Sequence, residues 1–233
     1  MSFLLNNTGV DLIILLCIRL LIVFTILPIH EFAHAYAARK LGDNTALIAG
    51  RLTLNPLAHV HPIGAAMLVL FGFGWAKPVP VNPRNFKNYR RDNALVSFAG
   101  PFSNLCCAIV AIFVNRVLEN IYSYVLLSGS AQTAFQYAYI AVNYFAVINI
   151  SLAVFNLLPI RPLDGSNILA YFLPAKINAF MYQYTNYIQI GLFLLIYLGI
   201  FTGPLSWLIS KAYSLLYMLF FWVDILFKLI FLH

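Results

Sequence analysis

Long apolar runs separated by short polar segments dominate the chain. Four of these runs are long enough to cross the roughly 30 Å hydrocarbon core of a bilayer as a helix: Val10 to about Ile29, Ala94–Leu118, Phe135–Leu158 and Leu205–Phe231. Tyr187–Thr202 is a shorter apolar run that also fits a span. The pattern predicts an all-α polytopic membrane protein with about five to six transmembrane helices.

One apolar stretch does not fit a simple span. Ile63–Trp75 is too short to cross the bilayer, and it contains three glycines. Prolines then alternate with Val79 and Val81, which favours an extended backbone over a helix. We therefore expect a re-entrant or short β-like segment near residues 63–81, covered by protein or water.

Composition and charge support a membrane protein. Apolar residues make up 62% of the 233 residues and charged residues 9%, against about half and a quarter in soluble domains. We expect residues 1–233 to form a single integral membrane domain, with a catalytic core at 10–174 and additional transmembrane helices at 175–233. The net charge of +7 implies no nucleic-acid partner, because the Lys and Arg residues lie mostly in short loops, as the positive-inside rule expects.

The segment with the clearest chemistry is His30-Glu31-Phe32-Ala33-His34, which has the pattern H-E-x-x-H. In a helix, residues i and i+4 lie on the same face, so His30 and His34 can offer two nitrogens to one metal ion. Glu31 can take a proton from a water on that ion, whose pKa zinc lowers to about 7. The pattern indicates a zinc hydrolase. Arg39 and Lys40 place this end of the helix in the cytoplasm.

A second polar group follows the third long apolar run. Asn156-Leu157-Leu158-Pro159 leads into Leu163-Asp164-Gly165, and two prolines interrupt the helix at membrane depth. A carboxylate at that depth needs a strong partner. Two His and one carboxylate with an open position form a catalytic zinc set, so Asp164 is the candidate third ligand.

Two other groups of polar residues have alternative interpretations. His59 and His61 could form a second metal site, but loop histidines without a neighbouring carboxylate are more often hydrogen-bonded to the backbone. Asp224 and Lys228 have the i, i+4 spacing of an intrahelical ion pair without a catalytic role.

These motifs together resemble the site-2 protease family of intramembrane zinc metalloproteases, and most closely its compact bacterial branch without PDZ or CBS domains. The resemblance rests on H-E-x-x-H at 30–34, the Asn-Pro segment at 55–64 and the N-x-x-P…L-D-G segment at 156–165. Residues 73–86 and Ala99-Gly100-Pro101 also look like that branch. One departure is His61-Pro62, where the family usually has Asp-Pro.

The resemblance implies a mechanism and a location. His30, His34 and Asp164 would ligate one Zn²⁺ per chain, and Glu31 would be the general base and then the acid. Asn156 would contact the substrate backbone or the oxyanion. The substrate would be a transmembrane segment of another protein, entering as an extended strand beside residues 73–81. The enzyme would lie in the bacterial inner membrane, with its active site toward the cytoplasm.

Two other functions are compatible with the same residues. A membrane metal-ion transporter also places His and Asp within a bilayer, but it would distribute several sites along one pore. A catalytically inactive scaffold that captures transmembrane helices would not need all four chemical residues together. The sequence names neither the physiological substrate nor the oligomeric state.

Overall fold

The computed structural model describes residues 16–17, 19–71, 74–124 and 129–231. Within these ranges the regular elements are helices, with one isolated antiparallel bridge between Val60 and Ala76 and no β-strand. The prediction of an all-α polytopic membrane protein is confirmed. The chain divides into two compact units: residues 1–103 with 167–172, and residues 104–166 with 173–233.

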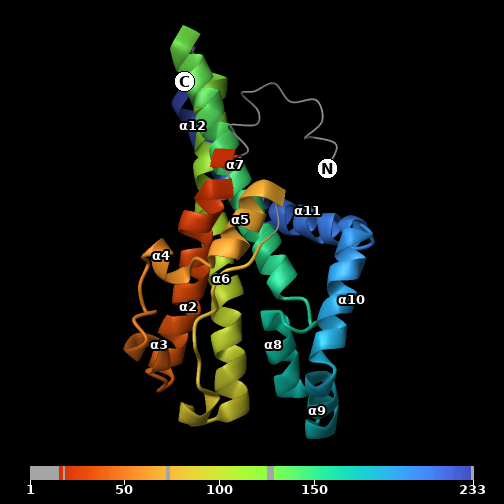
Figure 1. Ribbon diagram of the computed structural model, residues 1–233. Helices are drawn as coiled ribbons and strands as arrows, with labels where there is room; N and C mark the ends of the chain where they lie inside the picture. Colours follow the sequence, from red (N-terminus) through yellow and green to blue (C-terminus); the bar gives the residue numbers. More distant parts are fainter. Residues whose placement is uncertain (1–15, 18, 72–73, 125–128, 232–233) are drawn as a thin grey trace. The chain divides into compact units, whose positions relative to one another are not determined.

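The helices of the first half of the chain are η2 (Ile22–Ile26), α2 (Leu27–Lys40), α3 (Thr45–Ile48), α4 (Pro56–His59), α5 (Pro62–Phe71), η3 (Pro83–Asn85) and α6 (Tyr89–Tyr124). They are followed by α7 (Gly129–Asn156), α8 (Asp164–Phe172), α9 (Ala175–Gln183), α10 (Thr185–Tyr197), α11 (Thr202–Met218) and α12 (Phe221–Phe231) (Figure 1). α6 and α8 each contribute residues to both units.

Fewer helices satisfy the criteria for a membrane span than the sequence predicts. Three described helices are long and apolar enough: Arg19–Lys40, Tyr89–Tyr124 and Gly129–Asn156. A fourth is possible if α10 and α11, which meet at an angle of 84°, count as one span. Most of the predicted span at 10–29 lies outside the described residues. The predicted span at 205–231 is interrupted at Leu219–Phe220, so it forms α11 and α12 instead.

Pro28 determines how α2 begins. Proline has no N–H and its ring obstructs the preceding turn, so the regular hydrogen-bond pattern is interrupted there. The turn before it is a π-helix, η2, and α2 begins at Leu27. α2 ends at Lys40, and Gly42 follows with φ +107°, a conformation that favours glycine.

The segment near residues 63–81 differs from the prediction in its first half. The segment was predicted to be re-entrant or β-like, and residues 62–71 form the helix α5, so the β-like alternative fails there. A re-entrant course stays a prediction, because a helix of ten residues is too short to cross the bilayer. The Arg19 guanidinium donates hydrogen bonds to the carbonyls of Val69 and Leu70, at 2.5 and 3.2 Å, and so caps the last turn of α5. Residues 74–82 are non-helical, as the alternating prolines predict.

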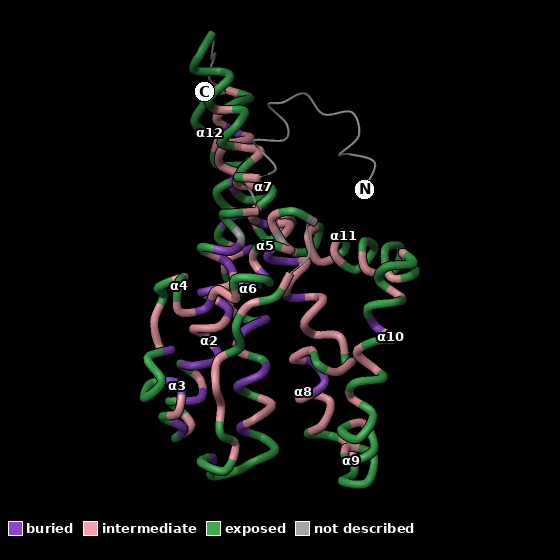
Figure 2. The backbone as a smooth tube through the Cα atoms, viewed as in Figure 1, coloured by how far each residue is buried: buried purple, intermediate pink, exposed green. Residues whose placement is uncertain are grey.

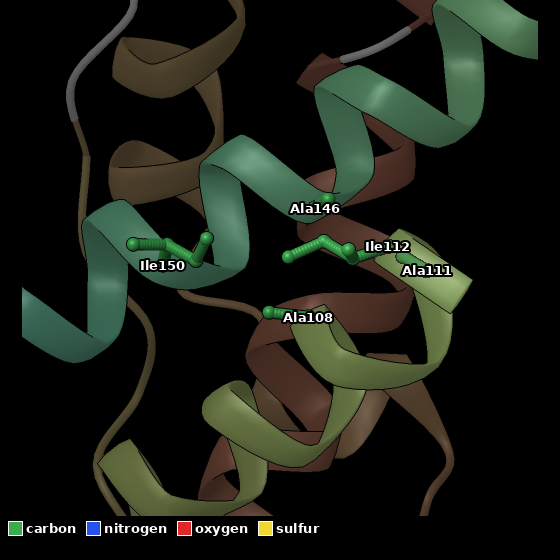
Figure 3. Close-up of a cluster of buried hydrophobic side chains, with 5 residues drawn as sticks. All are labelled: Ala108, Ala111, Ile112, Ala146 and Ile150. Atoms are coloured by element: carbon green, nitrogen blue, oxygen red, sulfur yellow. The ribbon is translucent and has the colours of Figure 1, made fainter. Parts of the chain in front are cut away.

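Small residues allow α6 and α7 to approach closely in the second unit. Ala108, Ala111 and Ile112 of α6 pack against Ala146 and Ile150 of α7, and all five are buried (Figure 3). Such contacts are typical of membrane helices, whose association depends on close packing. Exposed apolar residues dominate α9–α12, where only Leu192 and Val223 are buried (Figure 2). These faces suit contact with lipid.

Candidate functional site

α2 brings the two motif histidines together. The Nε2 atoms of His30 and His34 are 3.1 Å apart, and the rings meet edge to face with centroids 4.7 Å apart. Both side chains are buried, with exposed fractions of 7% and 9%. A tetrahedral zinc ion about 2.0–2.1 Å from two imidazole nitrogens holds those nitrogens about 3.3 Å apart. The histidine pair therefore fits zinc.

A backbone carbonyl on α6 orients His34. The Nδ1 atom lies 2.7 Å from the carbonyl oxygen of Val96. Because a carbonyl can only accept, Nδ1 must carry the proton and donate it. In the neutral ring the lone pair is then on Nε2, the atom that faces His30. Carbonyl partners of this kind fix the tautomer and the ring orientation of metal-binding histidines.

Gly100, one turn after Val96, leaves room for the histidine pair. A Cβ atom at this position would lie 2.3 Å from Nε2 of His34 and 2.6 Å from Cε1 of His30. Ordinary carbon contacts are longer than 3.4 Å. Any side chain at residue 100 would therefore displace both rings.

Glu31 is adjacent to the first histidine and contacts the non-helical segment between α5 and α6. Its Oε2 accepts a hydrogen bond of 2.9 Å from the N–H of Val79. The carboxylate thus has a backbone donor from a segment 48 residues away in the sequence. The contact was not predicted, because backbone groups carry no sequence signature.

Asn156 and Asp164 lie in the second unit, at two neighbouring helix ends. Asn156 is the last residue of α7, and Asp164 is the first residue of α8. Gly165 makes the close approach possible, because a Cβ atom there would lie 2.2 Å from the carbonyl oxygen of Leu157 and 2.5 Å from that of Leu158. The L-D-G pattern therefore has a structural reason for its glycine: the start of α8 packs on the backbone that ends α7.

The continuation of α8 contacts α6. Asn167, three residues after Asp164, donates from Nδ2 to Oγ of Ser97 at 3.1 Å. Ser97 directly follows Val96, whose carbonyl oxygen holds His34. The first unit thus contains a contact between the helix that begins with Asp164 and the part of α6 that supports the histidine pair.

His59 and His61 have structural partners. Nε2 of His59 lies 2.8 Å from the Thr53 carbonyl oxygen and must donate to it, while Nδ1 faces the Arg51 guanidinium at 3.4 Å. His61 accepts a hydrogen bond of 3.2 Å from the N–H of Gly64. Both nitrogens of His59 therefore have hydrogen-bond partners, as expected for loop histidines bonded to the backbone.

Comparisons with known proteins agree with the motifs. A sequence model described as "Peptidase family M50" matches residues 115–198. The chain is 41% identical over 191 residues to "Putative zinc metalloprotease YwhC" of Bacillus subtilis (strain 168), which covers 82% of this chain and 81% of that protein. The chain belongs to this peptidase family, the site-2 protease family. It is a metallopeptidase and a membrane protein.

More distant relatives in the family are larger. The chain is 33% identical over 144 residues to "Putative zinc metalloprotease Rip2" of Mycolicibacterium smegmatis. It is 35% identical over 145 residues to the protein of the same name from Mycobacterium tuberculosis (strain Erdman). Each match covers 60% of this chain but 51% of the relative, so the chain spans about half the length of these Rip2 proteins. No solved structure matches.

Proposed function

We propose that this M50 peptidase is an intramembrane zinc metalloprotease that hydrolyses peptide bonds in or near the transmembrane segments of other membrane proteins. One observation carries the proposal: the buried Nε2 atoms of His30 and His34 lie 3.1 Å apart on an apolar candidate span. Buried ionisable side chains within apolar spans are costly and are usually functional. The relative YwhC is also named for zinc.

The metal set that we propose is His30, His34 and Asp164, holding one zinc ion per chain. The contact between Asn167 and Ser97 supports the third ligand, because it ties the helix that begins with Asp164 to the turn of α6 that holds His34. When bound, zinc supplies a Lewis acid that polarises the scissile carbonyl and lowers the pKa of water.

The protein side chains then carry the proton transfers. Glu31 takes a proton from the attacking water as oxygen adds to the scissile carbonyl carbon. The protonated Glu31 gives that proton to the departing nitrogen as the C–N bond breaks. We assign Asn156 to the substrate backbone or the developing oxyanion, where its amide can donate a hydrogen bond.

Charge distribution supports the proposed orientation. Arg39 and Lys40 form the last turn of α2, about two turns beyond the histidine pair. Four more cations, Arg84, Lys87, Arg90 and Arg91, lie at the start of α6 and just before it. Under the positive-inside rule these ends face the cytoplasm. We therefore place the active site toward the cytoplasmic side of a bacterial inner membrane.

The experiment that tests this proposal is to measure zinc per chain in detergent for the wild type, His34→Ala and Glu31→Ala. We expect about one zinc in the wild type and in Glu31→Ala, and little in His34→Ala, because of these two substituted residues only His34 belongs to the proposed metal set. Cleavage of a pool of synthetic transmembrane peptides, followed by mass spectrometry, should be lost in both variants. A folded wild type that binds no zinc would contradict the proposal, and several zinc ions per chain would favour a transporter.

A further inference from the structure

The segment from Gly74 to Asn82 contacts Glu31 through a single backbone N–H. Pro78 and Pro80 have no N–H, so between residues 77 and 81 only Lys77, Val79 and Val81 retain a donor. Lys77 donates to the carbonyl oxygen of His59 at 2.8 Å, and Val79 donates to Glu31 at 2.9 Å. Both of these donors therefore bond to the protein itself.

Contacts of the residues before and after Val79 fix the position of its N–H. Before it, Ala76 bridges to Val60, and the Arg51 guanidinium donates to the Lys77 carbonyl oxygen at 2.5 Å. After it, the N–H of Asn82 donates to the Asp43 carboxylate at 2.7 Å. Asp43 is completely buried. The backbone is thus held at Lys77, two residues before Val79, and at Asn82, three residues after it. The Val79 N–H therefore has little freedom to move, and it determines where the Glu31 carboxylate lies.

We propose that the backbone amide of Val79 positions Glu31 for proton transfer; this rests on the role of Glu31 proposed above. A glutamate side chain has three rotatable bonds, and fixing them in one arrangement costs conformational entropy. The N–H of Val79 holds one carboxylate oxygen and so limits the side chain to one arrangement beside the histidine pair. Proton transfer needs such placement, since a displacement of about 1 Å can cost about 100-fold in rate.

The prolines on either side suit this role better than strand addition. A substrate strand that pairs along residues 77–81 would need N–H donors on the outward side of the segment. At Pro78 and Pro80 the segment offers carbonyls only. Phe73, the first residue of the expected substrate edge, lies outside the described residues. The donors of Lys77 and Val79 bond to His59 and Glu31, so neither is left to pair with a substrate strand.

The test is Val79→Pro, which removes this donor from a segment that already alternates prolines. Val81→Pro is the matched control, because no hydrogen bond from the Val81 N–H occurs among the described residues. The probe is the synthetic transmembrane peptide that the wild type cleaves fastest. We expect Val79→Pro to keep one zinc and an unchanged KM but to lose about 10- to 100-fold in kcat. Val81→Pro also changes the side chain that packs against Ala38, Phe86 and Val96, so some loss of thermal stability is expected. Its zinc content, KM and kcat should match the wild type.

A second variant avoids the added ring. Replacing Val79 by its α-hydroxy acid exchanges the N–H for an ester oxygen and keeps the side chain. The same loss in kcat with full zinc content supports the proposal. An unchanged kcat in either variant would overturn it, and so would a loss of zinc together with thermal stability in the ester variant. A wild type that binds zinc but cleaves no peptide would instead contradict the proposed function on which it rests.

Discussion

At the residue scale, the histidine pair depends on groups that are neither ligands nor acids. The Val96 carbonyl oxygen fixes which nitrogen of His34 is protonated, and Gly100 provides the space beside both rings. Both lie on α6, more than 60 residues after the motif. The H-E-x-x-H pattern therefore describes only half of the local arrangement that we propose for the metal.

Gly100→Ala should weaken zinc binding without unfolding the protein. The added methyl group would lie 2.3 Å from Nε2 of His34, so the rings must move apart or turn. Changes beside metal ligands typically cost about 10- to 100-fold in affinity. Competition with a chromogenic chelator in detergent measures that affinity. Gly191→Ala in α10 is the control, because a Cβ there meets nothing within 4 Å. Equal affinities in the two variants would refute this explanation.

Sequence spacing predicted the relation of His30 to His34 because both residues lie on one helix, where position follows from helical geometry alone. The supporting contacts could not be predicted in the same way. Val96 acts through its backbone carbonyl and Val79 through its backbone N–H. Every residue has the carbonyl, and every residue except proline has the N–H, so neither contact can be recognised from the residue type. Ala99-Gly100-Pro101 was the available signal, since glycine followed by proline within an apolar helix is costly without a packing reason.

At the scale of elements, a buried carboxylate joins the end of α2 to the segment that holds Glu31. Asp43 accepts hydrogen bonds from the hydroxyl and the N–H of Thr45, at 2.5 and 3.0 Å. It also accepts from the N–H of Asn82 and the side-chain amide of Asn85, both at 2.7 Å. Burial alone would raise the pKa of Asp43, but these donors lower it, and the net result is a pKa below its ordinary value. The charged form is therefore the one that stabilises the fold.

The stabilisation from Asp43 should depend on pH. Because the folded-state pKa is depressed, the contribution is complete above the unfolded-state pKa of about 3.9 and is lost as the pH falls through the lower folded-state value. Asp43→Asn should cost about 1–3 kcal/mol at neutral pH, since its amide group would face donors. Thermal unfolding in detergent between pH 3 and 7 measures both effects. Asn44→Ala, at an exposed neighbour, should change neither; a pH profile in Asp43→Asn identical to the wild type would contradict the assignment.

The sequence predicted the C-terminal end of α2 and the non-helical segment correctly, because Gly42 and the prolines at 78 and 80 restrict the backbone locally. Its β-like alternative for the segment near residues 63–81 was wrong for residues 62–71, which form α5. A short apolar run with glycines is ambiguous between a helix and extended backbone. The Arg19 guanidinium, which bonds to carbonyls at the end of α5, comes from a residue 50 positions earlier and leaves no trace in the local pattern.

At the scale of the whole molecule, one polar cluster joins four helices of the second unit. The Arg116 guanidinium on α6 contacts the Asp224 carboxylate on α12, and it also lies over the ring of Tyr217 on α11, 4.0 Å from its centroid. Tyr139 on α7 donates to Glu119 at 3.0 Å. The sequence interpretation paired Asp224 with Lys228 within one helix, but the structure pairs it with Arg116, 108 residues away.

Breaking this cluster should destabilise the second unit. Asp224→Leu leaves the partly buried charge of Arg116 without its main partner, so we expect a loss of about 1–3 kcal/mol. Arg116→Met should lower the free energy of unfolding by a similar amount. The loss in the double variant should be smaller than the sum of the losses in the two single variants. Thermal unfolding of all four forms gives the coupling energy. Lys228→Met is the control and should have little effect. Strictly additive losses would show that the two charges do not interact.

The length of α6 has a consequence for the membrane around the protein. Its 36 residues, at about 1.5 Å each, extend about 54 Å, whereas the hydrocarbon core is about 30 Å thick. The helix must therefore tilt or extend into the headgroup layers, and the balance depends on bilayer thickness. The Val96 carbonyl oxygen that bonds to His34 lies on this same helix. We therefore expect the length of the lipid acyl chains to influence the proposed metal site, and with it the rate of cleavage, without any ligand binding to the enzyme.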